Sequence, residues 1–202
     1  MLREPVAMNH DKPRAMELGW RMVESRCRYE SKITRLRDDK IVVPGKSEPL
    51  DYAYLERAEA VIILPVTTSG DVVLIRQYRY PVDEWCVEIP AGGTHDGEGA
   101  SLEEIVRKEL REEIGATAKE VCAVTWFYSA PSFGDEKCHV FLALGVELEH
   151  EPKTEQTEEL ETLIVPAREA LRMARSGEMK TGPCTLGLLL CEEALRARWI
   201  LR

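Results

Sequence analysis

Residues 108–115, KELREEIG, carry three closely spaced glutamates within a helical pattern of apolar residues. For a helix of about 100° per residue starting at Leu102, Glu109 lies at about 340° and Glu113 at about 20°. Both angles fall inside the apolar stripe, which is formed by Leu102, Ile105, Val106 and Leu110. Glu112, at about 280°, falls at the edge of that stripe. The sequence therefore predicts a helix that turns carboxylates towards the protein interior.

Carboxylates that face inward need a compensating positive charge, because burial removes their hydration and neighbouring negative charges repel. A hard divalent cation provides that charge, since Mg²⁺ and Mn²⁺ prefer carboxylate oxygen ligands. The alternative is a solvated acidic face with i,i+4 partners such as Glu104 and Lys108. That alternative suits the opposite side of the helix, on which Glu104, Arg107, Lys108 and Arg111 lie. The geometry favours metal binding by Glu109, Glu112 and Glu113.

A glycine pair precedes this helix in the stretch Ala91-Gly92-Gly93. Glycine has no Cβ, so the backbone there can approach an ion or a phosphate closely. Glutamates at fixed spacing beside such a stretch predict a site for a metal ion and a diphosphate.

Composition and charge limit the classes of function. The chain has 202 residues, of which 44% are hydrophobic, and its net charge is −9. This length suits one domain, or one domain with a small appendage. The negative charge argues against a nucleic-acid partner, which requires a basic surface. It still allows a small phosphorylated substrate, because a bound divalent cation brings positive charge.

The six cysteines have no C-x-x-C spacing, and most lie in apolar runs, which predicts buried, reduced thiols in a cytoplasmic protein. The first residues, MLREPVAMNHDKPRAM, show no apolar signal-peptide region, and the longest apolar runs are too short to span a membrane. We therefore expect a cytoplasmic protein without a membrane partner.

The pattern of elements divides the chain near residue 58. Residues 20–58 predict two or three exposed strands, with turns at RDD (37–39) and PGKSEP (44–49). Such a thin segment buries little alone, so it is expected to pack on the main domain or on a second chain. We predict a strand-rich dimerisation segment over residues 1–58 and a main domain over residues 59–202.

The pattern of elements in the main domain predicts an α+β fold with a mixed sheet, organised as an α/β/α sandwich. The central helix begins with a capping box, Ser101 and Glu104, and ends at Gly115. The stretch AGGTHDGEGA before it is expected to be a loop, and CTLGLLLCEEALRARW one helix. The expected strands are AVIILPV, VVLIRQYRY, WCVEIP, VCAVTWFYSA, KCHVFLALGVELE and LETLIVP, and the other expected helix is VPAREALRMARSGE.

Residues 92–115 resemble the Nudix box, G-x5-E-x7-R-E-U-x-E-E-x-G, in which U is aliphatic. Gly92 and Glu98 match its first half, and the second half is matched by Glu109, Leu110, Glu112, Glu113 and Gly115. The sequence departs from the pattern twice. Nine residues separate Glu98 from the next motif position, and that position is Lys108 in place of arginine. Lysine keeps the charge but lacks the fork that orients a carboxylate.

The chain resembles the ADP-ribose pyrophosphatase branch of this family over about residues 18–195. The stretches that carry this resemblance are VVLIRQYRYPVDEWCVEIPAGG, FYSAPSFGDEKCHVFLA and EELETLIVP. It implies a Nudix fold and Mg²⁺-dependent hydrolysis, with Mn²⁺ as an alternative, of a nucleoside diphosphate linked to a sugar. ADP-ribose would give AMP and ribose 5-phosphate.

The resemblance also implies roles for individual residues. Glu109, Glu112 and Glu113 would hold the metal with the Ala91 carbonyl, and Gly92 and Gly93 would lie against the substrate. Glu112 and Glu113 are also expected to be catalytic.

Arg79 matches an arginine that grips the substrate, and its fork suits phosphate oxygens; the alternative is an exposed strand arginine. Glu158 matches a loop glutamate proposed as the general base, and Glu112, Glu159 and Glu161 remain alternatives, as does a solvated acidic run. Trp20 and Tyr54 match aromatics that sandwich adenine across a homodimer interface, and ordinary interface packing is the alternative.

Two other functions stay open. One is a Nudix hydrolase of another linked diphosphate: a GDP-sugar, a CDP-alcohol or a dinucleoside polyphosphate. The other is a Nudix-fold binding or regulatory module without hydrolysis. Lys108 and the two extra residues favour such a module, whereas the intact glutamates of the helix oppose it, because a module without hydrolysis has no need of inward carboxylates.

Overall fold

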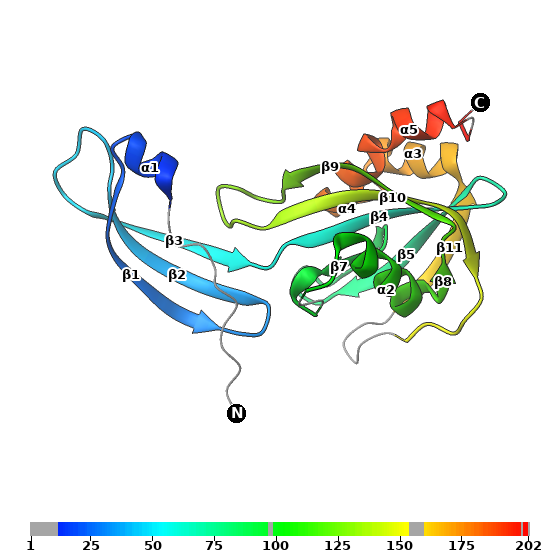
Figure 1. Cartoon of the computed structure of the whole chain (residues 1–202), viewed down its shortest axis with the longest axis horizontal. Coiled ribbons are helices and arrows are strands. Elements are labelled where there is room, and N and C mark those ends of the chain that lie inside the picture. Colours follow the sequence, from blue (N-terminus) through cyan, green and yellow to red (C-terminus); the bar gives the residue numbers. More distant parts are fainter. Residues whose placement is uncertain (1–11, 97–98, 154–159, 199, 202) are drawn as a thin grey trace. The chain divides into compact units, whose positions relative to one another are not determined.

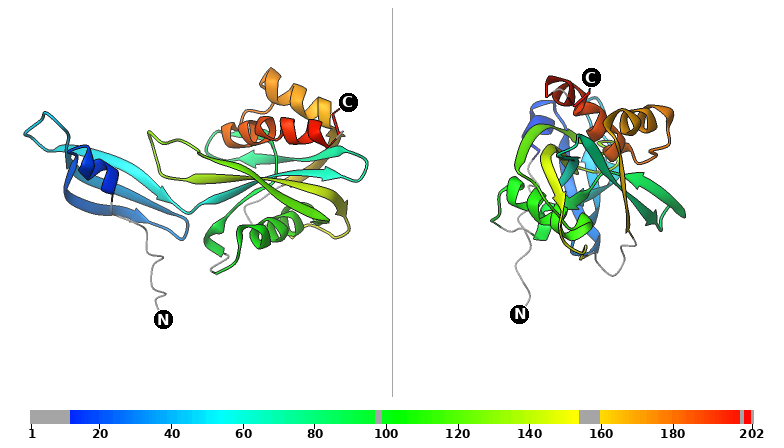
Figure 2. Two further views of the ribbon diagram at one scale, coloured as in Figure 1. Left: turned by 45° about the horizontal axis from the view of Figure 1, so that its top comes forward. Right: turned by 90° about the vertical axis from the view of Figure 1, so that its right-hand side faces the viewer.

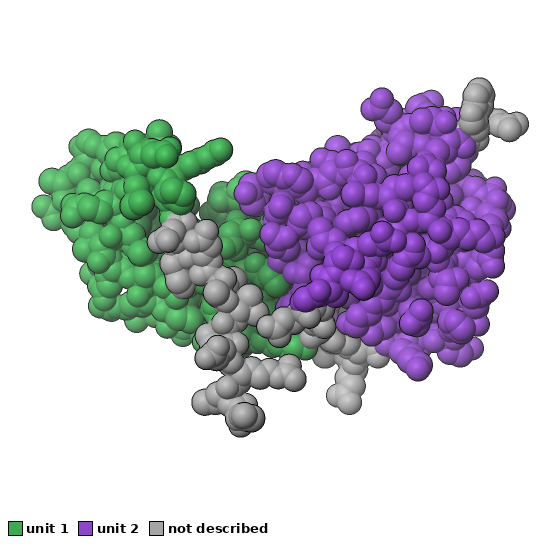
Figure 3. Space-filling model, viewed as in Figure 1, with its two compact units in different colours: residues 1–58, 130–136 green, residues 59–129, 137–202 purple. Residues whose placement is uncertain are grey.

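The computed structural model describes residues 12–96, 99–153, 160–198 and 200–201. The chain forms two compact units, shown in Figure 3. Unit 1 consists of residues 1–58 and 130–136, and unit 2 of residues 59–129 and 137–202. The division after residue 58 coincides with the change in sequence pattern, but the sequence analysis did not assign residues 130–136 to the N-terminal part.

Unit 1 is a three-stranded antiparallel sheet in the order β1-β2-β3, preceded by a short helix, α1 (Pro13–Glu17). The strands are β1 (Arg21–Glu30), β2 (Thr34–Val42) and β3 (Leu50–Arg57). Residues 130–136 join this unit through β3, because the Leu55 N–H donates to Phe133 O (3.0 Å) and the Asp135 N–H donates to Leu55 O (3.2 Å).

The first turn of unit 1 was predicted at the wrong place. Residues 37–39 lie inside β2, and the chain turns instead after Glu30, where the Ser31 hydroxyl accepts from the Thr34 N–H (3.1 Å). Polar residues are tolerated inside β2 because they face polar partners across the sheet: Asp39 pairs with Ser25 of β1, and its side chain accepts the Ser25 hydroxyl. The turn at residues 44–49 joins β2 to β3 as expected.

Unit 2 is built on a mixed sheet in the order β11-β5-β4-β10-β8 (Figure 1). Strands β4 and β10 run parallel, and the other pairs are antiparallel. Further strands extend it, because β6 pairs with β5, β7 with β4 and β9 with β10. The strands are β4 (Ala60–Thr67), β5 (Asp71–Arg79), β6 (Glu84–Glu88), β7 (Ala91–Gly93), β8 (Ala116–Thr117), β9 (Glu120–Tyr128), β10 (Lys137–Leu148) and β11 (Leu160–Pro166).

Helices cover both faces of this sheet (Figure 2). Successive residues of a strand point to opposite faces. Val61 and Ile63 accordingly pack with α2 (Leu102–Ile114), whereas Ile62 and Leu64 pack with the C-terminal helices. Those helices are α3 (Ala167–Ser176), α4 (Gly182–Leu190) and α5 (Glu192–Ala197). The predicted α+β sandwich with a mixed sheet is confirmed.

The sheet splits between β4 and β5. These strands pair only at Val66 and Val72, after which β7 runs along β4 and β6 along β5. The chain passes from β6 to β7 through Ile89 and Pro90, and Pro90 O accepts from the Ile63 N–H (2.8 Å). The stretch AGG was expected to be a loop, but it forms strand β7 because the edge of β4 is open at this point. The split places the glycine stretch next to α2.

The ends of α2 follow the sequence signals. The Ser101 hydroxyl accepts from the Glu104 N–H (3.2 Å), and the Glu104 carboxylate accepts from the Ser101 N–H (2.7 Å), which completes the capping box. Gly115 ends the helix in the left-handed conformation, with φ of 62°.

The C-terminal helical stretch is interrupted. The predicted single helix over CTLGLLLCEEALRARW is divided into α4 and α5 at the fully buried Cys191. Within the described part of the chain, no helix combines the length and the apolar character needed to cross a bilayer.

Candidate active site

The α2 glutamates face the directions that the helical pattern predicts. Glu109 and Glu113 are buried, with 9% and 6% of their surface exposed, whereas the Glu112 side chain is 42% exposed. The apolar stripe of α2 packs on the sheet beside them. Two carboxylates are thus held between the helix and the sheet, and the third lies at the edge.

The backbone of strand β7 lies directly against these carboxylates. The Glu109 carboxylate lies so close to Gly92 that a Cβ at this position would overlap it. One residue earlier, the Ala91 N–H donates to Glu113 Oε2 (3.2 Å). The absence of a side chain at Gly92 is therefore what admits Glu109, and the β7 backbone fixes Glu113.

The donor set suits a hard divalent cation. Glu109 and Glu113 supply oxygen atoms in a half-enclosed site, the Ala91 carbonyl is close in sequence to both contacts, and oxygen is the ligand that such cations prefer. Within residues 12–96, 99–153, 160–198 and 200–201, no group of three or more His, Cys, Asp or Glu side chains is already gathered around one point. Glu112 would have to turn from the helix edge to complete such a group.

The cations of α2 have different partners. Lys108 Nζ lies 3.2 Å from Glu112 Oε2, and both side chains are about 40% exposed. Arg107 instead donates through Nε and Nη2 to Glu103 (3.1 and 2.8 Å) and through Nη1 to Ala118 O (2.7 Å). Lys108 thus contacts a motif glutamate, whereas Arg107 contacts Glu103.

Arg79, at the end of β5, is held by a residue that the sequence analysis did not single out. Its Nε and Nη2 donate to the two carboxylate oxygens of Glu88 (2.9 and 2.5 Å). These hydrogen bonds raise the pKa of Arg79, and the nearby negative charge of Glu113 acts in the same direction. Arg79 is thus not a freely exposed strand arginine. The available signal for Glu88 was an acidic residue in the otherwise apolar stretch CVEIP.

The candidate general bases are only partly described. Glu158 and Glu159, like the motif residue Glu98, lie outside the described residues. Glu161 lies in β11 and forms an ion pair with Arg76 (3.0 Å). Arg76 follows Ile75, which faces α2, so Arg76 and Glu161 lie on the opposite face of the sheet. The structure does not bring Glu161 to the α2 carboxylates.

The two aromatics Trp20 and Tyr54 come together in unit 1. Both line a pocket of about 400 Å³, together with Tyr52 and Asp39. Trp20 is 38% exposed, and the Lys12 ammonium lies over the Tyr54 ring, 4.8 Å from its centre. The pocket combines flat apolar surfaces with polar groups.

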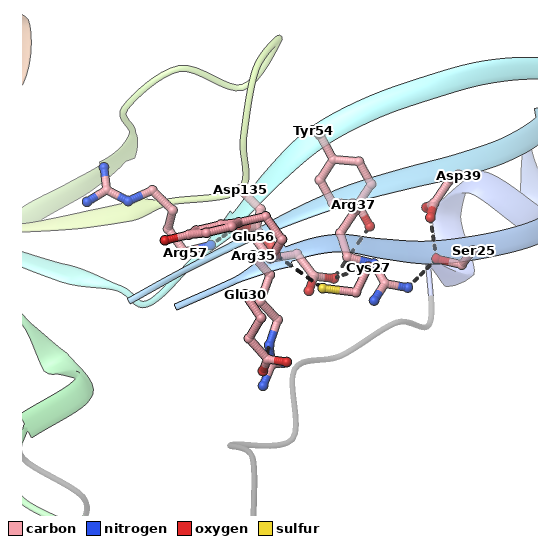
Figure 4. Close-up of polar contacts among 11 residues, drawn as sticks. Ser25, Cys27, Glu30, Arg35, Arg37, Asp39, Tyr54, Glu56, Arg57 and Asp135 are labelled. Carbon is pink, nitrogen blue, oxygen red and sulfur yellow. Dashed lines mark hydrogen bonds and ion pairs between the residues drawn. The ribbon is translucent and has the colours of Figure 1, made fainter. Parts of the chain in front are cut away.

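A buried polar cluster underlies Tyr54 (Figure 4). The Tyr54 hydroxyl donates to Glu56 Oε1 (3.5 Å), and Arg37 Nε lies 3.9 Å from the same oxygen. Burial, and then the charges of Asp39 and Glu56, raise the pKa of Tyr54. The cluster therefore favours the neutral form of the Tyr54 hydroxyl.

Comparisons with known proteins agree with this geometry. The family model of the NUDIX domain matches residues 56–182. The chain belongs to the Nudix family.

Among its relatives, the ADP-ribose pyrophosphatase of Bacillus subtilis is 34% identical over 84% of this chain and 92% of its own length. A GDP-mannose pyrophosphatase of Salmonella arizonae is 33% identical over 63% of this chain and 69% of its own length. A crystal structure titled as an ADP compounds hydrolase shares the fold, with a TM-score of 0.78 at 19% identity, and covers 90% of this chain and 97% of its own. The predicted Nudix pyrophosphohydrolase, similar to ADP-ribose pyrophosphatases, is confirmed.

Membership gives the α2 glutamates a context. Helix α2 is the helix of the Nudix box, and Nudix hydrolases generally use divalent metal ions. The inward carboxylates and the β7 backbone at Gly92 and Gly93 fit such an ion. The individual roles of Ala91, Gly92, Gly93, Glu109, Glu112 and Glu113 remain predictions from the box.

The first prediction concerns the Nudix helix carboxylates. Glu109→Gln and Glu113→Gln keep the side-chain volume but remove the charge that would hold a cation, so each should lower metal-dependent turnover by about a hundredfold or more. Urea unfolding should remain cooperative. Glu103→Gln, an exposed glutamate of the same helix, is the control. A double Glu109→Gln, Glu113→Gln protein with undiminished turnover would contradict the assignment.

The second prediction concerns Lys108. Arginine at this position would hold Glu112 with two parallel hydrogen bonds, whereas lysine holds it as a point charge on a flexible stem. Lys108→Arg should therefore raise kcat by about tenfold with little change in KM, and Lys108→Ala should lower kcat. Steady-state kinetics of Arg107→Ala provide the comparison. A crippled Arg107→Ala beside an unaffected Lys108→Ala would transfer the orienting role to Arg107.

Proposed function

We propose that this chain is a Mg²⁺-dependent hydrolase of nucleoside diphosphates linked to a sugar, with ADP-ribose as the main substrate and AMP and ribose 5-phosphate as products. The observation that carries the proposal is the pair of buried carboxylates, Glu109 and Glu113, against the β7 backbone. The Bacillus subtilis ADP-ribose pyrophosphatase, similar over most of both chains, supports the choice of substrate.

The reaction places defined demands on these residues. Water attacks one phosphorus of the diphosphate, the bond from that phosphorus to the bridging oxygen breaks, and the bridging oxygen leaves with the other phosphate. Glu109, Glu113 and the Ala91 carbonyl would hold Mg²⁺, with Glu112 joining them from the helix edge. When bound, Mg²⁺, or Mn²⁺ as an alternative, supplies charge neutralisation at the phosphoryl oxygens and acidifies its bound water.

The remaining groups would bind and orient the substrate. Arg79 offers N–H groups that are not used by Glu88 to the phosphate oxygens. Gly92 and Gly93 let the backbone approach the diphosphate. Glu158, Glu112 and Glu159 are the candidates for the general base that receives the proton of the attacking water.

The pocket of unit 1 is the candidate site for the nucleobase. Trp20 and Tyr54 present flat faces on which an aromatic base can stack, and the Tyr54 hydroxyl donates to Glu56 in the buried cluster. The proposed assembly is a homodimer, in which Trp20 and Tyr54 from two chains would enclose the base. A cytoplasmic location and the absence of nucleic-acid and membrane partners complete the proposal.

A GDP-sugar is the second candidate substrate, because the Salmonella arizonae relative is named a GDP-mannose pyrophosphatase. Stacking on Trp20 and Tyr54 does not by itself distinguish adenine from guanine, since both have aromatic faces. CDP-alcohols and dinucleoside polyphosphates belong to the same chemical class. A binding module without hydrolysis is supported by Lys108 and by the two extra residues of the box.

The third prediction is the outcome of a substrate panel. With Mg²⁺, release of the nucleoside monophosphate should show the highest kcat/KM for ADP-ribose among ADP-ribose, GDP-mannose, a CDP-alcohol and a dinucleoside polyphosphate. Chelation of the metal should stop the reaction. A higher kcat/KM for GDP-mannose would make a GDP-sugar the main substrate in place of ADP-ribose. Tight binding of ADP-ribose without release of AMP would establish the binding module.

The fourth prediction concerns assembly. A thin three-stranded sheet leaves apolar side chains exposed, among them Met22, Val23 and Tyr29, and a second chain would cover such a surface. The full chain should sediment as a dimer at micromolar concentration, and a chain that begins near Ala58 should lose the dimer or its solubility. A well-behaved full-length monomer would contradict the prediction.

A further inference from the structure

Glu88 is a fully buried carboxylate at the split of the sheet, with 0% of its surface exposed. Oε1 accepts from Arg79 Nε (2.9 Å) and from the Thr181 hydroxyl (2.8 Å). Oε2 accepts from Arg79 Nη2 (2.5 Å) and faces the Cys184 thiol (3.9 Å). Each oxygen thus meets two donors, which uses the acceptor capacity of the carboxylate.

Such an arrangement is a costly way to fill a protein interior. Moving a carboxylate out of water is offset only when its partners are well placed, and apolar residues of similar volume often stabilise a protein equally well. Stability alone therefore gives no reason to keep a charged pair here. The location offers another reason, because Glu88 lies three residues before Ala91, whose N–H holds Glu113.

Only one side of the Arg79 guanidinium is occupied by Glu88. The Arg79 side chain remains 41% exposed, and its Nη1 takes no part in the contact with Glu88. A bidentate pair fixes both the position and the plane of the guanidinium. The exposed donors of Arg79 consequently have a set direction.

The donor that completes this arrangement comes from the far end of the chain. Thr181 is the residue before α4, and it reaches Glu88 across a separation of 93 positions in the sequence. Four residues later, Thr185 donates its hydroxyl to Met179 O (3.0 Å) instead of to Glu88. Thr181, just before α4, thus contacts Glu88, and Thr185, inside α4, offers a matched threonine whose hydroxyl has a different acceptor.

We propose that Glu88 and Thr181, called here the Arg79 clamp, are positioning residues that hold the Arg79 guanidinium at the angle required by the diphosphate of the substrate. This inference rests on the proposed function. It assigns a role in the reaction to a buried residue of β6 and to the start of α4, which lie outside the Nudix box.

The test compares Thr181→Val with Thr185→Val. Both changes replace a hydroxyl by a methyl group at one end of the same helix. Thr181→Val should lower kcat/KM for ADP-ribose by about tenfold, whereas Thr185→Val should stay within about twofold of the parent. Thr181→Ser keeps the hydroxyl and should retain activity. If Thr181→Val does not fold, Glu88→Gln, with an expected loss of about a hundredfold, takes its place.

A double-mutant cycle separates positioning from a structural role. Arg79→Lys removes the fork and should itself lower kcat/KM by about a hundredfold. In the Arg79→Lys protein, Thr181→Val should then cost less than about twofold, because no fork remains to be positioned. A purely structural role would instead give the same loss in both backgrounds. Urea unfolding of both threonine variants should remain cooperative.

The outcomes distinguish the clamp from the proposed function. A parent protein that hydrolyses no member of the substrate panel overturns the proposed function and the clamp with it. An active parent in which Thr181→Val matches Thr185→Val overturns the clamp alone. Equal losses in the parent and Arg79→Lys backgrounds, or an Arg79→Lys protein with full activity, also overturn the clamp alone.

Discussion

The burial of negative charge near the split of the sheet is the constraint on which the rest of unit 2 depends. Glu88, Glu109 and Glu113 are each at least nine-tenths buried, and all three lie near the split between β4 and β5. Carboxylates lose hydration there and repel one another, so each needs a specific donor or cation. Glu88 has Arg79 and Thr181, and Glu113 has the Ala91 N–H. The Glu109 carboxylate lies against Gly92, where a Cβ would overlap it.

The split of the sheet is what makes these contacts compatible. If β4 and β5 paired along their whole length, the strand backbones would use their own N–H groups, and β6 and β7 would have no edge to join. Separation after Val66 and Val72 opens both edges. The short passage from Glu88 to Ala91 then carries a buried ion pair at one end and a carboxylate contact at the other. Two apolar cores, one on each face, hold this polar passage in place.

Local sequence signals predicted the elements whose causes are local. The capping box at Ser101 and the stop at Gly115 set the ends of α2, and the period of its apolar residues set the direction of Glu109. Features that arise from distant pairing were not visible: AGG becomes a strand because β4 lies beside it, and Thr181 contacts Glu88 from 93 positions away. The prediction of a turn at residues 37–39 was wrong for the same reason, since cross-strand partners accommodate the polar residues of β2.

Arg79 and Lys108, two cations near the α2 carboxylates, differ in how firmly the structure holds them. Arg79 is a planar fork bound to the Glu88 carboxylate of β6, which also accepts from Thr181 before α4, so hydrogen bonds to two other segments orient the fork. Lys108 is a point charge on an exposed helical face, and its partner Glu112 is equally exposed. An exposed pair of this kind contributes little energy and permits many geometries. The β5–β6 side of the site is therefore held by a buried ion pair, whereas the pair at the helix edge is exposed.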